Sequence, residues 1–146
     1  MKGFVFSGWF NNAYQPGDFG FLVLAEPKGE ELGWLGILTG GSPNGKVWDQ
    51  TGYPAATPYD GEKLIINSSA FGARDCRFGN PCTVAVGSPL TGGSSGGSWN
   101  FFYNEDYGLV ANGVNSYKYR DCSMNAYSPY FGSDVWNLFQ MAVAEE

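Results

Sequence analysis

The chain has 146 residues, which is enough for one domain with a hydrophobic core of its own. Its 22 glycines, 17% aromatic residues and only 15% charged residues are typical of a turn-rich all-β protein. The formal net charge of −6 argues against partners such as nucleic acid or an anionic membrane surface, and no apolar run is long enough for a transmembrane helix.

Short apolar runs separated by Gly- and Pro-containing turns predict a series of strands. The first run, FGFLVLA at residues 19–25, is continuously apolar and predicts a strand that is buried on both faces. Further strands are expected at residues 34–38, 63–67, 83–87, 98–103 and 108–114. Because no internal repeat or interdomain linker interrupts this series, the spacing favours a single β-barrel or β-sandwich.

One helix is expected, near the end of the chain. Ser133 is expected to cap it, and Asp134 suits the positive end of the helix dipole. Apolar residues then recur at helical spacing, at Val135, Leu138, Phe139, Ala142 and Val143. This pattern predicts one apolar face that packs on the β body.

Three cysteines and the absence of histidine limit metal and redox chemistry. Cys76 and Cys82 bracket a short Gly/Pro loop, DCRFGNPC, which a disulfide would staple in an oxidising compartment, leaving Cys122 as the odd cysteine. With no histidine and no CxxC pair, neither a zinc site nor any other metal site is expected. Asn67 begins the triplet NSS, an acceptor for N-glycosylation in a eukaryotic secreted protein.

The run TGGSSGGSWN at residues 91–100 is the most unusual segment. Gly/Ser-rich runs are typical of flexible linkers, but this one lies between two predicted strands. It also fits the G-x-S-x-G pattern of α/β-hydrolases, but the strand-like SWNFFYN follows where that motif needs a helix. A glycine cluster between barrel strands instead exposes backbone amides, which can stabilise an anion.

Several segments resemble the trypsin-like (chymotrypsin-fold) serine proteases, in particular their secreted microbial branch. TGGSSGGSW resembles the nucleophile loop, GDFGFLVL the aspartate segment and LVANGVNSY the substrate-lining strand. GYPAATPYDGEKL resembles a Gly-Tyr-Pro segment of that branch, and YFGSDVWNLFQMA its closing helix. Together these segments cover most of residues 14–143.

The resemblance implies an all-β fold, a chymotrypsin-like antiparallel β-barrel with a C-terminal helix. Residues 1–25 correspond to a remnant of the N-terminal barrel, including the triad aspartate. Residues 26–146 correspond to the C-terminal barrel, with the nucleophile loop and the terminal helix. Because the front of the first barrel has no counterpart, the chain is expected to be truncated at its N-terminus.

The resemblance also assigns roles to individual residues. Ser95 is the expected nucleophile, and Asp18 is the carboxylate that orients the general base. The backbone N–H groups of Gly93 and Ser95 are the expected oxyanion hole, where a donor is worth about 3–4 kcal/mol of transition-state stabilisation. Glycine at position 93 leaves its amide accessible to the substrate.

Three further residues are expected to contact the substrate: Pro89, Asn115 and Ser116. Pro89 stands six residues before Ser95, where family members with basic specificity carry an aspartate. A preference for Lys or Arg in the primary pocket is therefore not expected.

The expected catalytic base is absent from the chain. The family uses a histidine that precedes the aspartate by a few dozen residues, and this sequence contains no histidine. A lysine base is a remote further option, but the sequence places neither Lys46 nor Lys63 beside Ser95. We therefore expect the chain to be inactive by itself.

The resemblance thus implies part of an extracellular serine endopeptidase that cleaves peptide or protein substrates through a Ser-His-Asp triad and needs no cofactor. MKGFVFSGW at the start is too short and too aromatic for a signal peptide. The alternative is a non-catalytic, protease-like β-barrel that binds peptide or protein. The substrate preference, the oligomeric state and the pairing of Cys122 stay open at this level.

Overall fold

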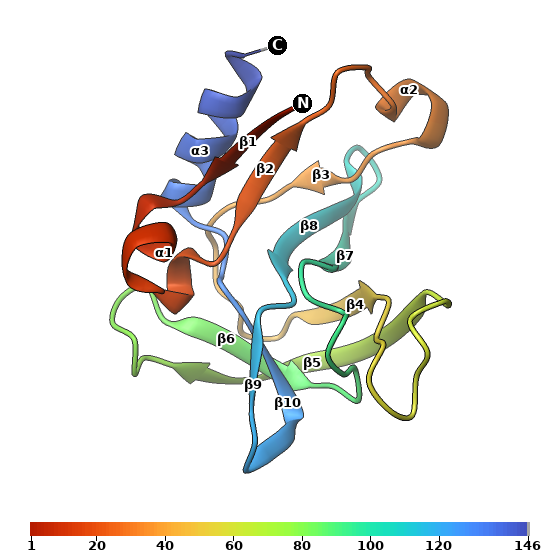
Figure 1. Cartoon of the computed structure of the whole chain (residues 1–146), viewed down its shortest axis with the longest axis vertical. Helices are drawn as coiled ribbons and strands as arrows, with labels where there is room; N and C mark the ends of the chain where they lie inside the picture. The colour runs from red at the N-terminus through yellow and green to blue at the C-terminus, as the bar shows by residue number, and fades with distance from the viewer. Residues whose placement is uncertain (146) are drawn as a thin grey trace.

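The structure, a computed structural model, describes residues 1–145. Its strands form two sheets (Figure 1). The smaller sheet pairs β1 (Lys2–Val5) with β2 (Gly20–Val23), antiparallel. The larger sheet has eight strands, in the order β3-β8-β7-β4-β5-β6-β10-β9. Its strands are β3 (Gly36–Ile37), β4 (Val47–Gly52), β5 (Ile65–Asp75), β6 (Thr83–Gly87), β7 (Ser98–Asn104), β8 (Gly108–Val114), β9 (Tyr117–Tyr119) and β10 (Cys122–Ser128).

The larger sheet curls into a barrel. Its neighbouring strands are antiparallel, except that β3 runs parallel to β8. Two backbone hydrogen bonds join the β8 side to the β10 side: Ser116 N–H donates to the Tyr127 carbonyl at 3.0 Å, and Phe131 N–H donates to the Asn112 carbonyl at 3.3 Å. Of the barrel and the sandwich that the strand series allows, the architecture is therefore the β-barrel that the family resemblance implies.

Two apolar clusters hold the molecule together. Inside the barrel, alternate residues of β4 point inward, and Trp48 packs against Trp99 with ring centroids 5.6 Å apart. The other buried members of this cluster are Val84, Val86 and Ala126. The second cluster lies between the β1–β2 sheet and α3 (Ser133–Val143) and contains Phe19, Phe131, Val135 and Leu138. The small sheet is thus anchored through the C-terminal helix.

Sequence patterns located several elements correctly. The predicted strands at 83–87 and 108–114 coincide with β6 and β8, and the strand at 98–103 lies within β7. Strands β1, β4, β9 and β10 were not expected, nor were two short helices, α1 (Ser7–Asn12) and α2 (Gly29–Leu32). A 3₁₀ turn at Gln15–Gly17 lies between α1 and β2.

The interpretation of residues 19–25 as a strand buried on both faces is wrong. Strand β2 covers only Gly20–Val23, with Leu22 69% exposed and Leu24 beyond it 51% exposed. The physical reason is that α3 packs against one face of β2, while β1 pairs with one edge. The opposite face of β2 is open to solvent.

Helix α3 is confirmed, but its expected cap is not. The helix begins at Ser133 itself, and the N-cap position is Gly132, with no side-chain hydrogen bond to the first turn. Val135, Leu138 and Ala142 are buried, as the apolar spacing predicts, whereas Val143 is 41% exposed and lines an open cavity between α3 and β2. Burial of Val135 and Leu138 contributes roughly 2 kcal/mol each.

The expected disulfide is present. Cys76 and Cys82 are joined across the loop between β5 and β6, and Cys122 is a free, partly exposed thiol. Within residues 1–145, no helix combines the length and the apolar character needed to cross a lipid bilayer.

Candidate active site

The loop between β6 and β7 presents one serine and buries its neighbour. Ser94 is 8% exposed, and its hydroxyl donates to the Thr91 carbonyl at 2.8 Å. Ser95 is exposed. The loop is closed by backbone bonds from Gly97 N–H to the Ser94 carbonyl and from Gly96 N–H to the Asn115 carbonyl. Of the two adjacent serines, Ser95 is therefore the one with an accessible hydroxyl.

The glycines of this loop are explained by close backbone contacts. A Cβ atom at position 97 would lie 1.9 Å from the Thr51 carbonyl oxygen, which no side chain can tolerate. At Gly93, φ is +99°, and a Cβ atom would lie 2.8 Å from the Ala55 amide nitrogen. The glycine-rich run is thus the form that a tight turn needs when it is pressed against the end of β4.

The amides of Gly93 and Ser95 are the two expected oxyanion-hole donors. Across residues 1–145, neither N–H donates to a backbone carbonyl or to a side chain, whereas the intervening Ser94 N–H bonds to Thr91. Both donors are thus available to an external acceptor. A backbone amide held in place and not used internally is the kind of group that stabilises a developing oxyanion.

Asp18 joins the small sheet to the barrel. It follows the 3₁₀ turn at Gln15–Gly17 and is half-buried. Its carboxylate accepts a hydrogen bond of 2.5 Å from the hydroxyl of Ser116, which lies just after β8. The bond links residues that are 98 positions apart in the sequence. It therefore fixes the Asp18 carboxylate relative to the chain segment around Ser116.

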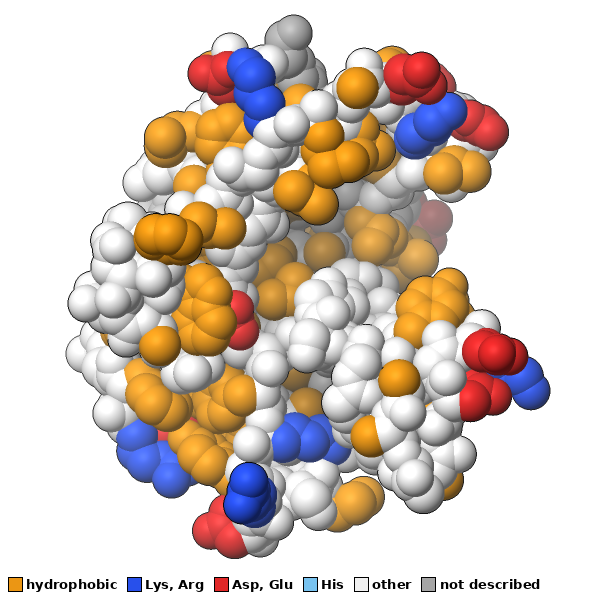
Figure 2. Space-filling view, viewed as in Figure 1, with side chains coloured by type: hydrophobic (Ala, Val, Ile, Leu, Met, Phe, Trp, Pro, Cys, Tyr) orange, Lys and Arg blue, Asp and Glu red, His pale blue; other side chains and the backbone are white. Residues whose placement is uncertain are grey.

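Asp18 and Ser95 line one cavity of about 490 Å³. Its walls come from the β1–α1 region on one side, including Val5 and Trp9, and from Val114 to Ser116 on the other. The space-filling view is hollowed between the small sheet and the barrel (Figure 2). The structure therefore brings together the two side chains that the sequence assigned to catalysis.

A second, smaller cavity of about 150 Å³ adjoins the first, and the two share Ser95, Asn115 and Ser116. It continues along Leu90, Thr91, Gly92, Ser94, Tyr117 and Lys118. Pro89 is exposed and is not part of its wall, so the wall begins one residue later, at Leu90. Tyr117 is the last residue of the segment LVANGVNSY, whereas Lys118 follows directly after it and was not singled out from the sequence.

Asn115 supports the loop as well as lining both cavities. Its amide nitrogen donates to the carbonyls of Thr51 at 2.7 Å and Ser94 at 2.9 Å, and its oxygen accepts from Trp99 Nε1 at 2.8 Å. All of these bonds are internal to the protein, and Asn115 is only 7% exposed. Asn115 therefore holds the glycine-rich loop before β7 in position.

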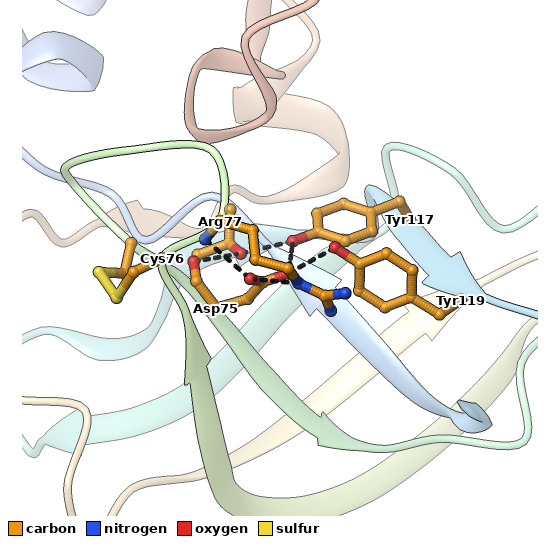
Figure 3. A network of polar contacts seen from close by, with 7 residues as sticks. Asp75, Cys76, Arg77, Tyr117 and Tyr119 are labelled. Atoms are coloured by element: carbon orange, nitrogen blue, oxygen red, sulfur yellow. Dashed lines mark hydrogen bonds and ion pairs between the residues drawn. A yellow bond between two sulfur atoms is a disulfide. The ribbon is translucent and has the colours of Figure 1, made fainter. Parts of the chain in front are cut away.

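A network around Asp75 fixes β9, which carries part of the second cavity (Figure 3). Oδ2 of Asp75 accepts hydrogen bonds from the hydroxyls of Tyr117 at 3.0 Å and Tyr119 at 2.6 Å. Oδ1 accepts from the backbone N–H and the Nε of Arg77, each at 3.0 Å. The Tyr117 ring also stacks on Tyr127, with centroids 4.7 Å apart.

This network governs the ionisation of Asp75. Burial by itself raises the pKa of the carboxyl, but the hydrogen bonds from Tyr119, Arg77 and Tyr117 outweigh it and lower the pKa from 3.8 to about 2. Below pH 4 the unfolded chain therefore takes up a proton that the folded chain does not, and stability falls until the pH approaches 2.

We expect Asp75→Asn to lower the free energy of unfolding at pH 6 by about 1–2 kcal/mol, a difference that shrinks as the pH falls toward 2. Urea unfolding of both proteins between pH 6 and pH 2 measures this. Asp106→Asn is the matched control, because Asp106 is exposed and its side chain forms no hydrogen bond within residues 1–145. A difference in unfolding free energy between the two proteins that is the same at every pH would contradict the lowered pKa of Asp75 in the folded protein.

The remaining candidates lie away from the cavities. Lys46 Nζ donates to Asn112 Oδ1 at 3.1 Å and to the Tyr130 hydroxyl at 3.0 Å, and neither Lys46 nor Lys63 lines either cavity. The Asn67 amide nitrogen donates to Gln50 Oε1 and to the Gly87 carbonyl, each at 2.8 Å, so a glycan there would displace one of these bonds. Within residues 1–145, no cluster of three His, Cys, Asp or Glu residues could hold a metal ion.

Comparisons with solved structures identify the fold, although no family model and no curated protein sequence matches the chain. A thermostable serine protease, AL20, from an extremophilic microorganism aligns with a TM-score of 0.82 and 27% identity over 100% of this chain and 67% of its own length. The protease Anisep from Arthrobacter nicotinovorans aligns with a TM-score of 0.77 and 27% identity over 99% and 66%. A Glu endopeptidase aligns with a TM-score of 0.76 and 17% identity over 99% and 63%.

This chain therefore spans about two thirds of the length of each of these proteases. The aligned part includes the small sheet, the barrel and the terminal helix, since the alignments cover nearly all of residues 1–146. The chain has the chymotrypsin-like fold of the bacterial serine proteases.

Proposed function

We propose that this chain is the part of an extracellular serine endopeptidase that carries the nucleophile, Ser95, and the orienting carboxylate, Asp18. The observation that carries the proposal is the single cavity of about 490 Å³ that both side chains line. The fold shared with bacterial serine proteases and the disulfide Cys76–Cys82, which suits an oxidising compartment, support it.

In this proposal the Ser95 hydroxyl attacks the carbonyl carbon of a peptide bond and forms an acyl-enzyme. The negative charge that develops on the carbonyl oxygen is stabilised by the N–H groups of Gly93 and Ser95. The hydroxyl proton passes to a histidine from outside this sequence, which Asp18 holds in the right tautomer, and then reaches the leaving amine. Ser116 keeps the Asp18 carboxylate in position.

The division of the chain follows from the same proposal. Residues 1–25, with the β1–β2 sheet and Asp18, belong to the first barrel of the enzyme. Residues 26–146, with Ser95 and both walls of the small cavity, belong to the second barrel. The cleft between them is where a peptide substrate would lie, which agrees with the hollow in Figure 2.

A second candidate function is a non-catalytic protein that binds peptides in the same cleft. The observation that favours it is the complete absence of histidine from the 146 residues. Without a base, the Ser95 hydroxyl is a weak nucleophile, whereas the cavities and the unpaired amides still offer a peptide-binding surface.

The two functions are separated by supplying the base. We compare residues 1–146 with a longer polypeptide that adds a segment containing a histidine before Asp18. Both are treated with a fluorophosphonate probe, and peptide mapping locates the labelled residue. We expect labelling of Ser95 in the longer polypeptide and none in the shorter one. A longer polypeptide that binds peptides but is neither labelled nor active would favour the binding protein.

A further inference from the structure

Among residues 1–145, Lys118 is the only charged residue that lines the small cavity beside Ser95. It occupies the middle position of β9, between Tyr117 and Tyr119, whose hydroxyls both reach Asp75. Because side chains alternate along a strand, Lys118 leaves from the opposite face of β9. The Asp75 network thus holds the strand so that the lysine reaches the cavity wall.

Lys118 is half-buried, and its ammonium group forms no ion pair with an acidic residue among residues 1–145. Its Nζ donates to the backbone carbonyls of Ser88 at 2.6 Å and Ser123 at 2.7 Å. Across residues 1–145, no Asp or Glu oxygen lies within 4.0 Å of it. Burial lowers the pKa of the amine from its usual value, as expected of a cation that is partly removed from water.

The environment therefore favours an anion. An ammonium ion has three N–H groups, and the two carbonyls accept from two of them. A carboxylate that enters the cavity would form a charge-assisted hydrogen bond with the third, in a site partly shielded from water. A lysine or arginine side chain entering the same space would instead face a like charge.

We propose that the 150 Å³ cavity receives the side chain that precedes the cleaved bond, and that Lys118 makes it select glutamate or aspartate. The inference rests on the proposed function, because it is the position of Ser95 in the wall of both cavities that makes the smaller one the primary pocket. The inference also agrees with the residue at position 89. A basic-specific enzyme would have an aspartate there, whereas this chain has Pro89, which lies outside the pocket wall, and the charge in the wall is the positive one of Lys118.

Peptide binding tests the pocket without requiring catalysis. Residues 1–146 are titrated at pH 7 with acetylated tetrapeptide amides that differ only in their last residue, which is Glu, Gln or Lys. We expect the Glu peptide to bind at least about tenfold more tightly than the Gln peptide, and the Lys peptide to bind most weakly. Isothermal titration calorimetry measures the three dissociation constants.

Variants of Lys118 test whether this residue causes the preference for the Glu peptide. Lys118→Gln should reduce the Glu-to-Gln ratio to near one, and Lys118→Arg should retain a preference for Glu because the positive charge remains. Lys63→Gln is the matched control for loss of one positive charge, because Lys63 is exposed and lies outside both cavities. If Lys118→Gln does not fold, the Glu-to-Gln affinity ratio of the unchanged protein still tests the inference.

A Glu-to-Gln ratio near one in the unchanged protein would overturn the inference, as would a ratio that survives Lys118→Gln or a lack of binding by all three peptides at millimolar concentration. These outcomes are separate from the labelling of Ser95. Labelling without a Glu preference leaves the enzyme assignment standing, and a Glu preference without labelling leaves the pocket assignment standing.

Discussion

Replacing Ser95 by alanine is expected to lower the turnover of the proposed histidine-containing enzyme by about six orders of magnitude, because the members of a catalytic triad act as one unit. The hydroxyl at position 95 is the accessible one in the loop, and the unpaired amides of Gly93 and Ser95 lie next to it in the chain. Alanine removes the proposed nucleophile and leaves both amides in place, so the cleft keeps its shape. Peptide hydrolysis and labelling by a fluorophosphonate probe measure the effect.

Ser94→Ala is the matched control for this variant. The Ser94 hydroxyl is buried and donates to the Thr91 carbonyl at 2.8 Å, so its loss costs about 1 kcal/mol of stability and removes no reacting group. We expect this variant to be labelled at Ser95 like the unchanged enzyme. Hydrolysis at the parent rate by the Ser95→Ala enzyme would show that the nucleophile has been assigned wrongly.

Replacing Asp18 by asparagine is expected to lower turnover by about 10⁴, because an amide favours the wrong tautomer of the imidazole that it holds. Asparagine has nearly the same shape and can still accept the hydrogen bond from Ser116. The thermal unfolding temperature should therefore change little. The measurement is the turnover number across a pH series, together with the melting temperature of each protein.

Ser116→Ala is a useful companion to the Asp18 variant. It removes the 2.5 Å hydrogen bond to the carboxylate but keeps the charge, so we expect a loss of about tenfold, far smaller than for Asp18→Asn. Equal losses in the two variants would mean that Asp18 acts mainly by holding the segment around Ser116. An Asp18→Asn enzyme with parental turnover would remove Asp18 from the catalytic machinery.

The sequence by itself determined those features whose causes are local. Strands β6 and β8 coincide with apolar runs bounded by turn residues, and the buried face of α3 follows from apolar residues at helical spacing. The loop between Cys76 and Cys82 is short enough for the disulfide to be expected from spacing. Glycine at position 93 could be interpreted as a turn requirement, because its φ of +99° suits glycine, whereas the need for glycine at position 97 comes from its close contact with Thr51.

Only the tertiary structure decided which distant residues meet. Asp18 and Ser116 are 98 positions apart, and Asp75 reaches tyrosines 42 and 44 positions away, because sheet order and register bring these strands together. The same register turns Lys118 toward the cavity beside Ser95, which no pattern in YKYRD indicates. Likewise, β2 looks fully buried from its apolar run, yet burial depends on what covers each face, and only one of its faces is packed against α3.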